Sequence, residues 1–441
     1  MSDFRPLLQA WLDEAANDAA IASWQGQPPG DRLITLQLEL GDYTGNWLEY
    51  LPVEPTYFCY QATPAHRDYR LGLGQAWRSE ANGNRRLDDL ANNLAATRKN
   101  WQGTQPAELL LAFPFHAGAQ PDVPGAVLEL PALWLIATGG RARACFSCRL
   151  REFSSQQQAV LKLLADGTHP TPEPVACPAQ MQPINDYAAW EQRVHHALQA
   201  IDNGPLKKLV LAREIEVCSE QPFAPATILQ RLLNQDGSGL TYARGTDRQC
   251  FLGTTPETLV ALDAGKITAD ALAGTAWPNS PHLEDSKNSR EQHYVVTAVA
   301  AALAPWCQPD SVQIAPREKC PAGQLQHWRS RVSGQALPTT TLLQLATALH
   351  PTPAVGGFPP LAAWRWLEAA GEQRTAWYSG GIGRIDAAGN GQLWVALRSA
   401  LLAGGCARLQ AGAGIVAGSD ALTEYRETEA KLGSMLAALQ P

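Results

Sequence analysis

The C-terminal part of the chain places acidic and glycine residues at spacings that could bind an anion through a metal ion. An apolar strand runs into the glycine-rich stretch 412–414, and an amphipathic helix begins after residues 418–420. Glycines leave backbone N–H groups accessible to a ligand, while Glu424, Glu427 and Lys431 share one helical face. A loop of bare amides beside clustered carboxylates suits an anion that is held through a hard divalent cation. An ordinary helix with a solvated Glu/Lys face explains the pattern equally well.

Lys208 and Glu257 could act as base and acid because each interrupts an apolar segment. Lys208 opens a predicted strand at 207–217, where burial would lower the pKa of its amine enough for use as a base. A lysine at the edge of a strand is the alternative. Glu257 follows a proline in a turn, where it is either an acid with a raised pKa or a carboxylate in the first turn of a helix.

Glu291 is a candidate metal ligand at the start of a helix. The apolar pattern predicts a helix at 288–306 with Ser289 as its cap, so Glu291 falls in the first turn. A carboxylate in that position binds a metal ion or simply complements the helix dipole.

Three further residues could contact a ligand. Arg398 lies in a predicted strand at 392–401, where its guanidinium could hold a carboxylate or form a structural ion pair. Tyr378 lies in a predicted strand at 377–386 and precedes glycines that would let a ligand approach, although a tyrosine in this setting also suits a core. His350 follows a predicted helix, where a histidine is either the C-cap of that helix or a catalytic group.

Composition indicates a compact globular protein. The 441 residues are 45% hydrophobic and 17% charged, with a formal net charge of −7. This acidic balance offers no basic surface to nucleic acid or to an anionic membrane. No apolar run is long enough to span a bilayer, and the first residues lack the pattern of a signal peptide, so we expect a cytosolic protein.

The nine cysteines are odd in number and scattered, which does not indicate a disulfide framework. Cys145 and Cys148 have the spacing of a redox or zinc motif, but no second Cys/His pair accompanies them. The residues around them alternate like a strand, which would direct the two thiols to opposite faces. We therefore expect structural thiols.

The chain divides into two predicted parts. Residues 1–170 are β-rich, with a helix over 1–25 and one polar helix at 84–100 among short strands. The proline-rich stretch 169–183 predicts a connection across the surface. Residues 184–441 alternate helices and strands and contain the candidate chemistry. The pattern predicts an α+β fold.

Several common catalytic motifs are missing from the sequence. It contains no Walker loop, no GxGxxG between a strand and a helix, no HExxH and no Gly-x-Ser-x-Gly. The usual nucleotide, zinc-protease and hydrolase interpretations are therefore not favoured. The residues alone predict an enzyme with a metal-assisted acid/base site that recognises carboxylates.

Taken together, the motifs resemble the chorismate-utilising enzyme family, and most of all its isochorismate-forming members. Eight pieces occur in the order and spacing of that family, which is a far more specific signal than any single piece. The pieces are Lys208–Arg213, Phe251–Glu257, Ala271–Thr275, Ser289–Glu291, His350–Gly357, Trp377–Gly381, Leu397–Ala400 and Gly412–Asp420 with Glu424–Glu427. They extend over residues 186–441.

The resemblance implies a large layered antiparallel β-sheet assembly with helices packed outside, and a mechanism. Lys208 would activate water for attack on C2 of chorismate, and Glu257 would protonate the departing C4 hydroxyl. Glu291 and Glu427 would bind Mg²⁺, with Glu424 beside them. Groups that hold the substrate would be His350, Ala354, Tyr378, Arg398, Gly412, Ala413 and Gly414.

The resemblance also implies an isomerase that converts chorismate reversibly to isochorismate, acting as a monomer. Menaquinone biosynthesis is the expected pathway, with a siderophore pathway as an alternative. Ala354, where ammonia-using relatives have Thr, favours water as the nucleophile. Salicylate synthases, which go on to eliminate pyruvate, are the second alternative. Asp270 stands where many relatives have Glu, which leaves its effect on ring positioning open.

Overall fold

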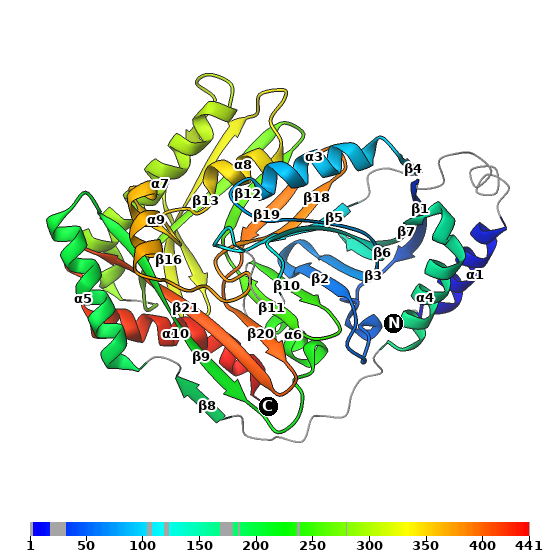
Figure 1. Cartoon of the computed structure of the whole chain (residues 1–441), viewed down its shortest axis with the longest axis horizontal. Helices are drawn as coiled ribbons and strands as arrows, with labels where there is room; N and C mark the ends of the chain where they lie inside the picture. Colours follow the sequence, from blue (N-terminus) through cyan, green and yellow to red (C-terminus); the bar gives the residue numbers. More distant parts are fainter. Residues whose placement is uncertain are drawn as a thin grey trace.

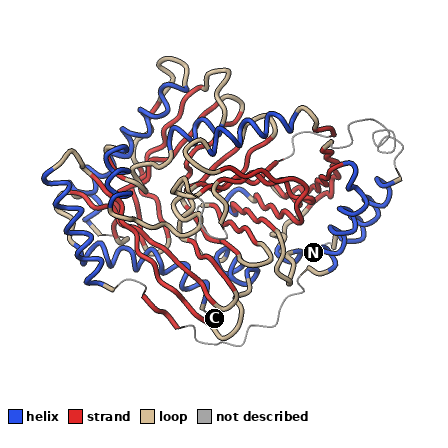
Figure 2. Tube along the Cα trace, in the orientation of Figure 1, coloured by secondary structure: helices blue, strands red, loops and turns tan. Residues whose placement is uncertain are grey.

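A computed structural model shows the chain as a large antiparallel sheet assembly with helices outside it (Figures 1 and 2). The described residues are 3–17, 32–103, 108–118, 123–167, 180–183, 186–235, 239–278 and 280–440. Within these stretches, 21 strands form one hydrogen-bonded network in which every pair is antiparallel except β1 with β4. The α+β class and the layered sheet expected from the sequence are confirmed.

The strands and helices alternate irregularly along the chain. The strands before residue 184 are β1 (Leu33–Asp42), β2 (Phe58–Thr63), β3 (Asp68–Ala81), β4 (Trp101–Gly103), β5 (Glu108–Phe113), β6 (Ala126–Thr138), β7 (Arg141–Arg149) and β8 (Gln180–Pro183). The later strands are β9 (Lys208–Cys218), β10 (Leu240–Gly245), β11 (Cys250–Thr255), β12 (Thr258–Asp263), β13 (Lys266–Ala276), β14 (Gln313–Ile314), β15 (Glu318–Ala322), β16 (Leu325–Gln335), β17 (Gly357–Phe358), β18 (Gly381–Asp386), β19 (Gly391–Val395), β20 (Ser399–Ala403) and β21 (Cys406–Val416). The helices are α1 (Arg5–Ala16), α3 (Arg86–Arg98), α4 (Phe153–Ala165), α5 (Tyr187–Asn203), α6 (Pro225–Leu233), α7 (Ser286–Leu303), α8 (Leu342–Leu349), α9 (Pro360–Ala369) and α10 (Ala421–Leu439).

The sheet network forks at the paired strands β3 and β6. A first branch runs from β3 through β2, β10, β11, β20 and β21 to β9. A second branch runs from β6 through β5, β18, β19, β12 and β13 to β16. The far ends of the branches meet at α7, which packs on β13 and β16 and also contacts β21.

Helices cover the branches because each presents an apolar stripe. In α5, Trp190, Val194, Ala197 and Ile201 recur three and four residues apart and are buried. Helices α5, α6 and α10 cover the first branch, while α7, α8 and α3 cover the second branch and its root. No helix within the described ranges has the length and apolarity needed to cross a membrane.

Two helices of the first part differ from expectation. Helix α1 ends at Ala16 rather than near residue 25, and residues 18–31 lie outside the described part of the chain. Helix α4 was not predicted, since only one polar helix was expected among the strands. Its buried face combines Phe153, Val160 and Leu164 with a polar Gln157, which weakens the apolar period.

Helix α7 begins earlier than predicted. Asp285 occupies the N-cap position and the helix starts at Ser286, so Ser289 is not the cap. Glu291 consequently lies beyond the first turn, where the interaction with the helix dipole has largely faded. The explanation of Glu291 as a simple first-turn carboxylate is therefore wrong.

The predicted strands at 377–386 and 392–401 are both interrupted. The first begins only at Gly381, which leaves Tyr378 in a turn. The second is two strands, since β19 pairs within the second branch and β20 within the first. Arg398 lies in the crossing between them with a left-handed φ of 46°, so its prediction as a strand residue is wrong.

The two predicted parts, 1–170 and 184–441, share the same network. Strand β2 pairs with β10, and β5 pairs with β18, so each branch mixes strands of both parts. The division itself stays a prediction. Most of the proline-rich connection lies outside the described residues, except that β8 pairs with β9.

The thiols of Cys145 and Cys148 point to opposite faces of β7, as the alternation predicted. Cys145 packs in a smaller core cluster with Trp134, and Cys148 belongs to the main core with Phe146. Burial raises the pKa of Cys145 to about 11 and that of Cys148 to about 12. Both are therefore protonated structural thiols at neutral pH.

A buried ion pair connects β6, where the two branches begin, with β10 in the first branch. Glu129 on β6 is fully buried, and Arg244 on β10 donates to both of its carboxylate oxygens at 2.8 and 2.5 Å. We expect Glu129→Ala to lower the free energy of unfolding by about 3 to 5 kcal/mol, because it leaves the Arg244 charge buried without its partner. Urea denaturation measures the loss.

The matched control is Glu318→Ala. Glu318 also pairs with an arginine, Arg329, but its side chain is 61% exposed. This variant should cost no more than about 1 kcal/mol. Equal losses in the two variants would contradict the assigned importance of the buried pair.

Candidate active site

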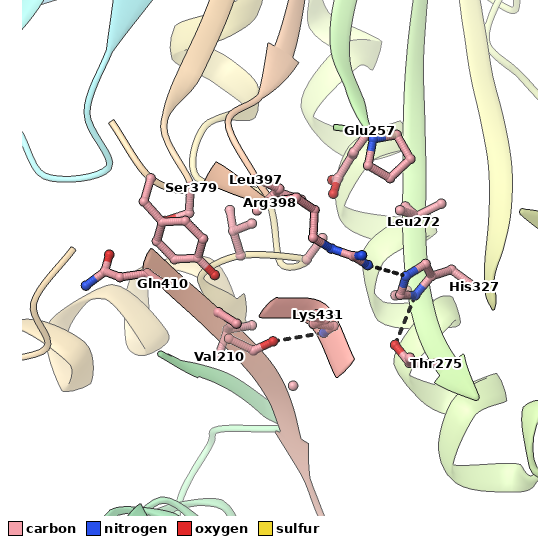
Figure 3. Close-up of a pocket in the computed structure, with 18 of the residues that line it drawn as sticks. Val210, Glu257, Leu272, Thr275, His327, Ser379, Leu397, Arg398, Gln410 and Lys431 are labelled. Atoms are coloured by element: carbon pink, nitrogen blue, oxygen red, sulfur yellow. Dashed lines mark hydrogen bonds between the residues drawn. The ribbon is translucent and has the colours of Figure 1, made fainter. Parts of the chain in front are cut away.

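A pocket lies where the ends of the two branches meet, and most of the predicted site residues lie in or beside it (Figure 3). The first branch contributes β9 and β21, the second contributes β13 and β16, and α7 and α10 close the space. The lining residues are Val210, Pro256, Glu257, Leu272, Ala273, Thr275, Glu291, His327, Ala354, Val355, Arg374, Tyr378, Ser379, Leu397, Arg398, Gln410, Ala411, Gly412, Gly414 and Lys431.

Lys208 and Glu291 form an ion pair beneath the pocket. The Lys208 Nζ lies 2.8 Å from Glu291 Oε1, and Lys208 is fully buried at the start of β9. Burial by itself raises the pKa of Glu291, but the charges of Lys208, Lys287 and Lys431 hold it below its usual value. Glu291 is therefore a carboxylate at neutral pH, and Lys208 is not an exposed edge lysine.

Gly414 makes room for this pair. A Cβ at residue 414 would lie 2.4 Å from Glu291 Oε1 and 3.0 Å from Lys208 Cε. Both distances are shorter than ordinary van der Waals contact. Glycine at this position therefore follows from the close approach of α7 to β21.

Glu257 has the opposite environment. It lies in the short connection between β11 and β12, is 2% exposed, and its Oε1 has no hydrogen-bond partner among the described residues. Burial, and next the negative charge of Asp270, raise the pKa of Glu257 to about 8. A strand rather than a helix follows it, so the first-turn alternative is wrong. At pH 7 the carboxyl is mostly protonated and can donate a proton.

The segment between β11 and β12, which contains Glu257, lies beside the segment between β19 and β20, which contains Arg398. The Val395 N–H donates to the Glu257 carbonyl at 3.0 Å, and the Thr254 N–H donates to the Arg398 carbonyl at 3.1 Å. Both segments pass from one branch to the other, in opposite directions. These paired crossings place the acid and the guanidinium on the same wall of the pocket (Figure 3).

Arg398 is oriented by His327 on β16. Burial lowers the pKa of Arg398 to about 10, which still leaves it charged at neutral pH, and burial also holds the pKa of His327 well below its usual value. The neutral imidazole accepts from Arg398 Nη2 at 3.3 Å through Nε2, so its Nδ1–H donates to Thr275 Oγ1 at 3.0 Å. A fixed cation thus faces the pocket.

The glycines of 412–414 lie in β21 and not in the loop that the sequence predicted. They pair with β9, opposite Ala212, Leu211 and Val210. The Ala212 N–H donates to Glu372 and the Val210 N–H donates to the Gly356 carbonyl, so both point away from β21. The hydrogen bonds between β9 and β21 at this point are therefore made by Leu211 and Ala413.

This register decides which amides a ligand could reach. Strand β20 pairs with β21 only as far as Leu409, so the outer edge of β21 is open beyond it within the described part. The Gly412 and Gly414 N–H groups face that edge, and Lys431 Nζ donates to the Gly412 carbonyl at 2.8 Å. The Ala413 amide faces β9, so its assignment as a ligand-binding amide is wrong.

Three carboxylates of α7 and α10 gather around lysines. Lys287 lies 2.5 Å from Glu424, and its pKa, lowered by burial, is raised overall by Glu424, Glu291 and Glu427. Lys431 lies 2.6 Å from Glu427 on the same helix. Burial and the charge of Glu427 raise the pKa of Glu424 to about 7. The face of α10 that the sequence left undecided is thus turned toward the site and is not an ordinary solvated surface.

His350 lies behind the pocket. Its Nε2–H donates to the Ser379 carbonyl at 2.9 Å, and the rings of Phe113 and Phe115 lie against it. Burial lowers the pKa of His350 to about 3, so it is neutral. It is not among the lining residues, whereas Ala354, Tyr378 and Arg398 are.

Sequence reasoning missed several lining residues. His327 is a single histidine in an alternating strand, Gln410 carries no motif, and Arg374 lies in a polar segment after a helix. Ser379 lies within the piece Trp377–Gly381, but the resemblance assigned it no role. Only Lys431 had a signal, its spacing of four from Glu427. The others reach the pocket through contacts between distant segments, which local patterns do not show.

Comparison with known proteins identifies the family. The family described as chorismate binding enzyme matches residues 33–440, almost the whole chain. The chain belongs to this family. The matched region of this chorismate binding enzyme contains both branches and every lining residue of the pocket.

Individual relatives cover less of the chain. The salicylate biosynthesis isochorismate synthase of Pseudomonas aeruginosa is 35% identical over 260 residues, which are 57% of this chain and 54% of that protein. Isochorismate synthase DhbC of Bacillus subtilis is 32% identical over 277 residues, 59% of this chain and 69% of that protein. This chorismate binding enzyme therefore spans only about half the length of the Pseudomonas relative.

The fold has a close counterpart among solved structures. The menaquinone-specific isochorismate synthase MenF of Escherichia coli superimposes with a TM-score of 0.80 at 22% identity, covering 97% of this chain and all of that one. This similarity confirms the architecture of the chorismate binding enzyme.

The raised pKa of Glu257 predicts a pH-dependent stability difference. The unfolded carboxyl ionises near pH 4.5 and the folded one near pH 8, so between these values the wild type becomes progressively less stable as pH rises. Glu257→Gln has no carboxyl group at this position, so its stability does not fall with pH for this reason. As pH rises, the unfolding free energy of Glu257→Gln minus that of the wild type should increase by up to about 1.4 kcal/mol per pH unit and level off above about pH 8.

Urea denaturation of both proteins across this pH range measures the difference. Glu54→Gln, at an exposed position, is the control and should follow the wild type. A Glu257→Gln curve parallel to wild type throughout would show that the Glu257 carboxyl is ionised in the folded protein.

Proposed function

We propose that the protein is an isochorismate synthase that adds water at C2 of chorismate and expels the C4 hydroxyl. The observation that carries the proposal is a protonated acid, Glu257, in the lining of the pocket, with a fully buried amine, Lys208, beneath it at 2.8 Å from the lining residue Glu291. In its neutral form, the Lys208 amine can take a proton from water. Glu257 can give its proton to the departing hydroxyl, so that one water enters and one leaves.

Carboxylate groups of the substrate would be bound by other residues around the pocket. Arg398 supplies a charged fork held by His327, and Tyr378 supplies a hydroxyl that burial keeps protonated. The Gly412 and Gly414 amides lie on the open edge of β21, beside Lys431. These donors suit a dicarboxylate such as chorismate.

Magnesium fits the acidic cluster of α7 and α10. Glu291 and Glu427 would hold the ion, with Glu424 supporting them, and carboxylate oxygens are the donors that Mg²⁺ prefers. The lysines that now neutralise these carboxylates, Lys208 and Lys431, would release them in part to the ion. Bound Mg²⁺ would offset the negative charge of the ring carboxylate of the substrate.

Asp270 and Ala354 bear on specificity. Asp270 accepts from the Thr258 N–H at 3.2 Å, and its charge helps keep Glu257 protonated. Asp270, which is shorter than the Glu of many relatives, would therefore affect the reaction through the protonation of Glu257. Ala354 lines the pocket, and in this family alanine there goes with water as the nucleophile. We propose a cytoplasmic, monomeric enzyme of menaquinone biosynthesis, as the family resemblance implies.

Product analysis tests the activity. Purified protein with chorismate and Mg²⁺ should form isochorismate without pyruvate. Lys208→Ala should lower kcat by about 10²- to 10⁴-fold, because the water would lose its general base. Liquid chromatography of the reaction measures both products.

Lys207→Ala is the matched control, since Lys207 is exposed and lies immediately before Lys208 in the chain. It should stay within about twofold of wild type. Pyruvate with salicylate would indicate a salicylate synthase, and no turnover would indicate a binding protein. Full activity in Lys208→Ala would reject Lys208 as the base.

Metal removal provides a separate prediction. Chelation should abolish turnover and added Mg²⁺ should restore it, because the acidic cluster would otherwise repel the substrate carboxylate. Glu427→Gln should raise the Mg²⁺ concentration needed for half-maximal rate at least tenfold. Glu429→Gln, an exposed carboxylate two residues further along α10, should not. Unchanged turnover after chelation would remove the metal from the proposal.

A further inference from the structure

Two cysteines distant from the pocket face each other across β9 and β21. Of the eight cysteines that the structure describes, six are buried, and the remaining two are Cys218, at intermediate exposure, and Cys406, which is exposed. Their sulfur atoms lie 3.8 Å apart, although 188 positions separate them in the sequence. The two described cysteines that are not buried are therefore neighbours.

The register of the strands makes this pair suitable for a covalent bond. Cys218 and Cys406 are directly opposite each other, and the flanking bonds are made by Ser219 N–H to the Gly405 carbonyl and by the pair Val217 with Ala407. Cys218 thus occupies a non-hydrogen-bonded pair, whose Cα atoms lie about 4.5 Å apart. This distance falls within the range that disulfides span, about 4.4 to 6.8 Å.

The surroundings favour a disulfide over a bound metal ion. Glu216, two residues before Cys218 on the same face, is the one carboxylate grouped with the thiols. Arg408 already pairs with Glu216 at 3.2 Å, which places a positive charge next to the thiols. Two thiols and a carboxylate that already pairs with an arginine do not supply the four ligands of a stable zinc site.

We propose that Cys218 and Cys406 form a reversible disulfide by exchange with small-molecule disulfides of the glutathione class. The Cys406 thiolate attacks one sulfur of glutathione disulfide, forming a mixed disulfide and releasing one glutathione thiolate. Cys218 then attacks the Cys406 sulfur and displaces the second glutathione. The protons of the two cysteines go to the two departing thiolates, so two protein thiols are oxidised and one glutathione disulfide is reduced.

Exposure and charge set the order of these steps. Cys406 is accessible at the start of β21, after a tight turn through Gly404 and Gly405. The hydrogen bond with Cys406, partial burial and the nearby Glu216 charge raise the pKa of Cys218, which keeps its thiol protonated longer. Cys406 is therefore the attacking residue and Cys218 the resolving one.

The disulfide would tie together the two strands that also carry the pocket. Lys208 begins β9 and Cys218 ends it, which separates them by about 33 Å along the strand. The bond would close a long loop and stabilise the fold without touching the site. This inference does not rest on the proposed function.

The test uses the full chain treated with glutathione disulfide. Wild type should lose two free thiols and yield a Cys218–Cys406 cross-linked peptide by mass spectrometry, and its thermal midpoint should rise by roughly 5 °C. Cys218→Ser should instead accumulate a glutathione adduct on Cys406. Cys406→Ser should show neither the cross-link nor the rise. Cys320→Ser, at a buried position, is the control and should keep both.

Three outcomes would overturn the proposal. They are unchanged free thiols in the treated wild type, a cross-link from either residue to a third cysteine, and an unchanged thermal midpoint after oxidation. Zn²⁺ binding by the reduced protein that Cys218→Ser abolishes, with no cross-link under glutathione disulfide, would also overturn it in favour of a metal site. Treatment with dithiothreitol should reverse all the expected changes.

Discussion

A charged pair buried between the two sheet branches is the interaction on which the site depends. Lys208 on β9 and Glu291 on α7 lie 2.8 Å apart with almost no access to solvent. Either charge alone at this depth would be strongly destabilising, so each offsets the cost of burying the other. Because α7 packs on β13 and β16, the pair holds the end of the second branch against the first. Gly414 permits the contact, since any side chain there would meet the carboxylate.

The same pocket gives a second carboxyl group the opposite state. Glu291 is surrounded by lysines and stays ionised, whereas Glu257 has Asp270 as a neighbour and no hydrogen bond to Oε1 within the described residues. The residue types are identical, and the environment alone separates them into an anion and an acid. Glu257 and Arg398 owe their positions to the same feature, because each lies where the chain passes between branches. Because such crossings are short and irregular, they can direct a side chain into the pocket. In a continuous strand, the alternation of the side chains would fix the face to which each one points.

Sequence-based prediction fails at one of these crossings and at places where contacts between distant segments decide the structure. Residues 392–401 look like one apolar strand because both halves are buried, but the halves pair with different partners, and Arg398 lies between them. Residues 412–414 look like a loop because two of them are glycines, yet β9 pairs with them. The glycine at 414 is required by packing against α7 and not by a turn. His350 looks like a ligand-binding residue from its motif, and only the fold shows that it supports Ser379 from behind.

By itself, the sequence determined the α+β class, the local elements and the residue types available for chemistry. Helix α8 follows from its capping box, and β5 from its apolar run, because caps and periods act between residues close in the chain. Only the tertiary structure decided that Lys208 meets Glu291, that Arg398 meets His327 and that Cys218 meets Cys406, contacts that span 71 to 188 positions. Ionisation and reactivity depend on burial and on neighbouring charges, and for these residues the neighbours come from segments that only the folded chain brings together.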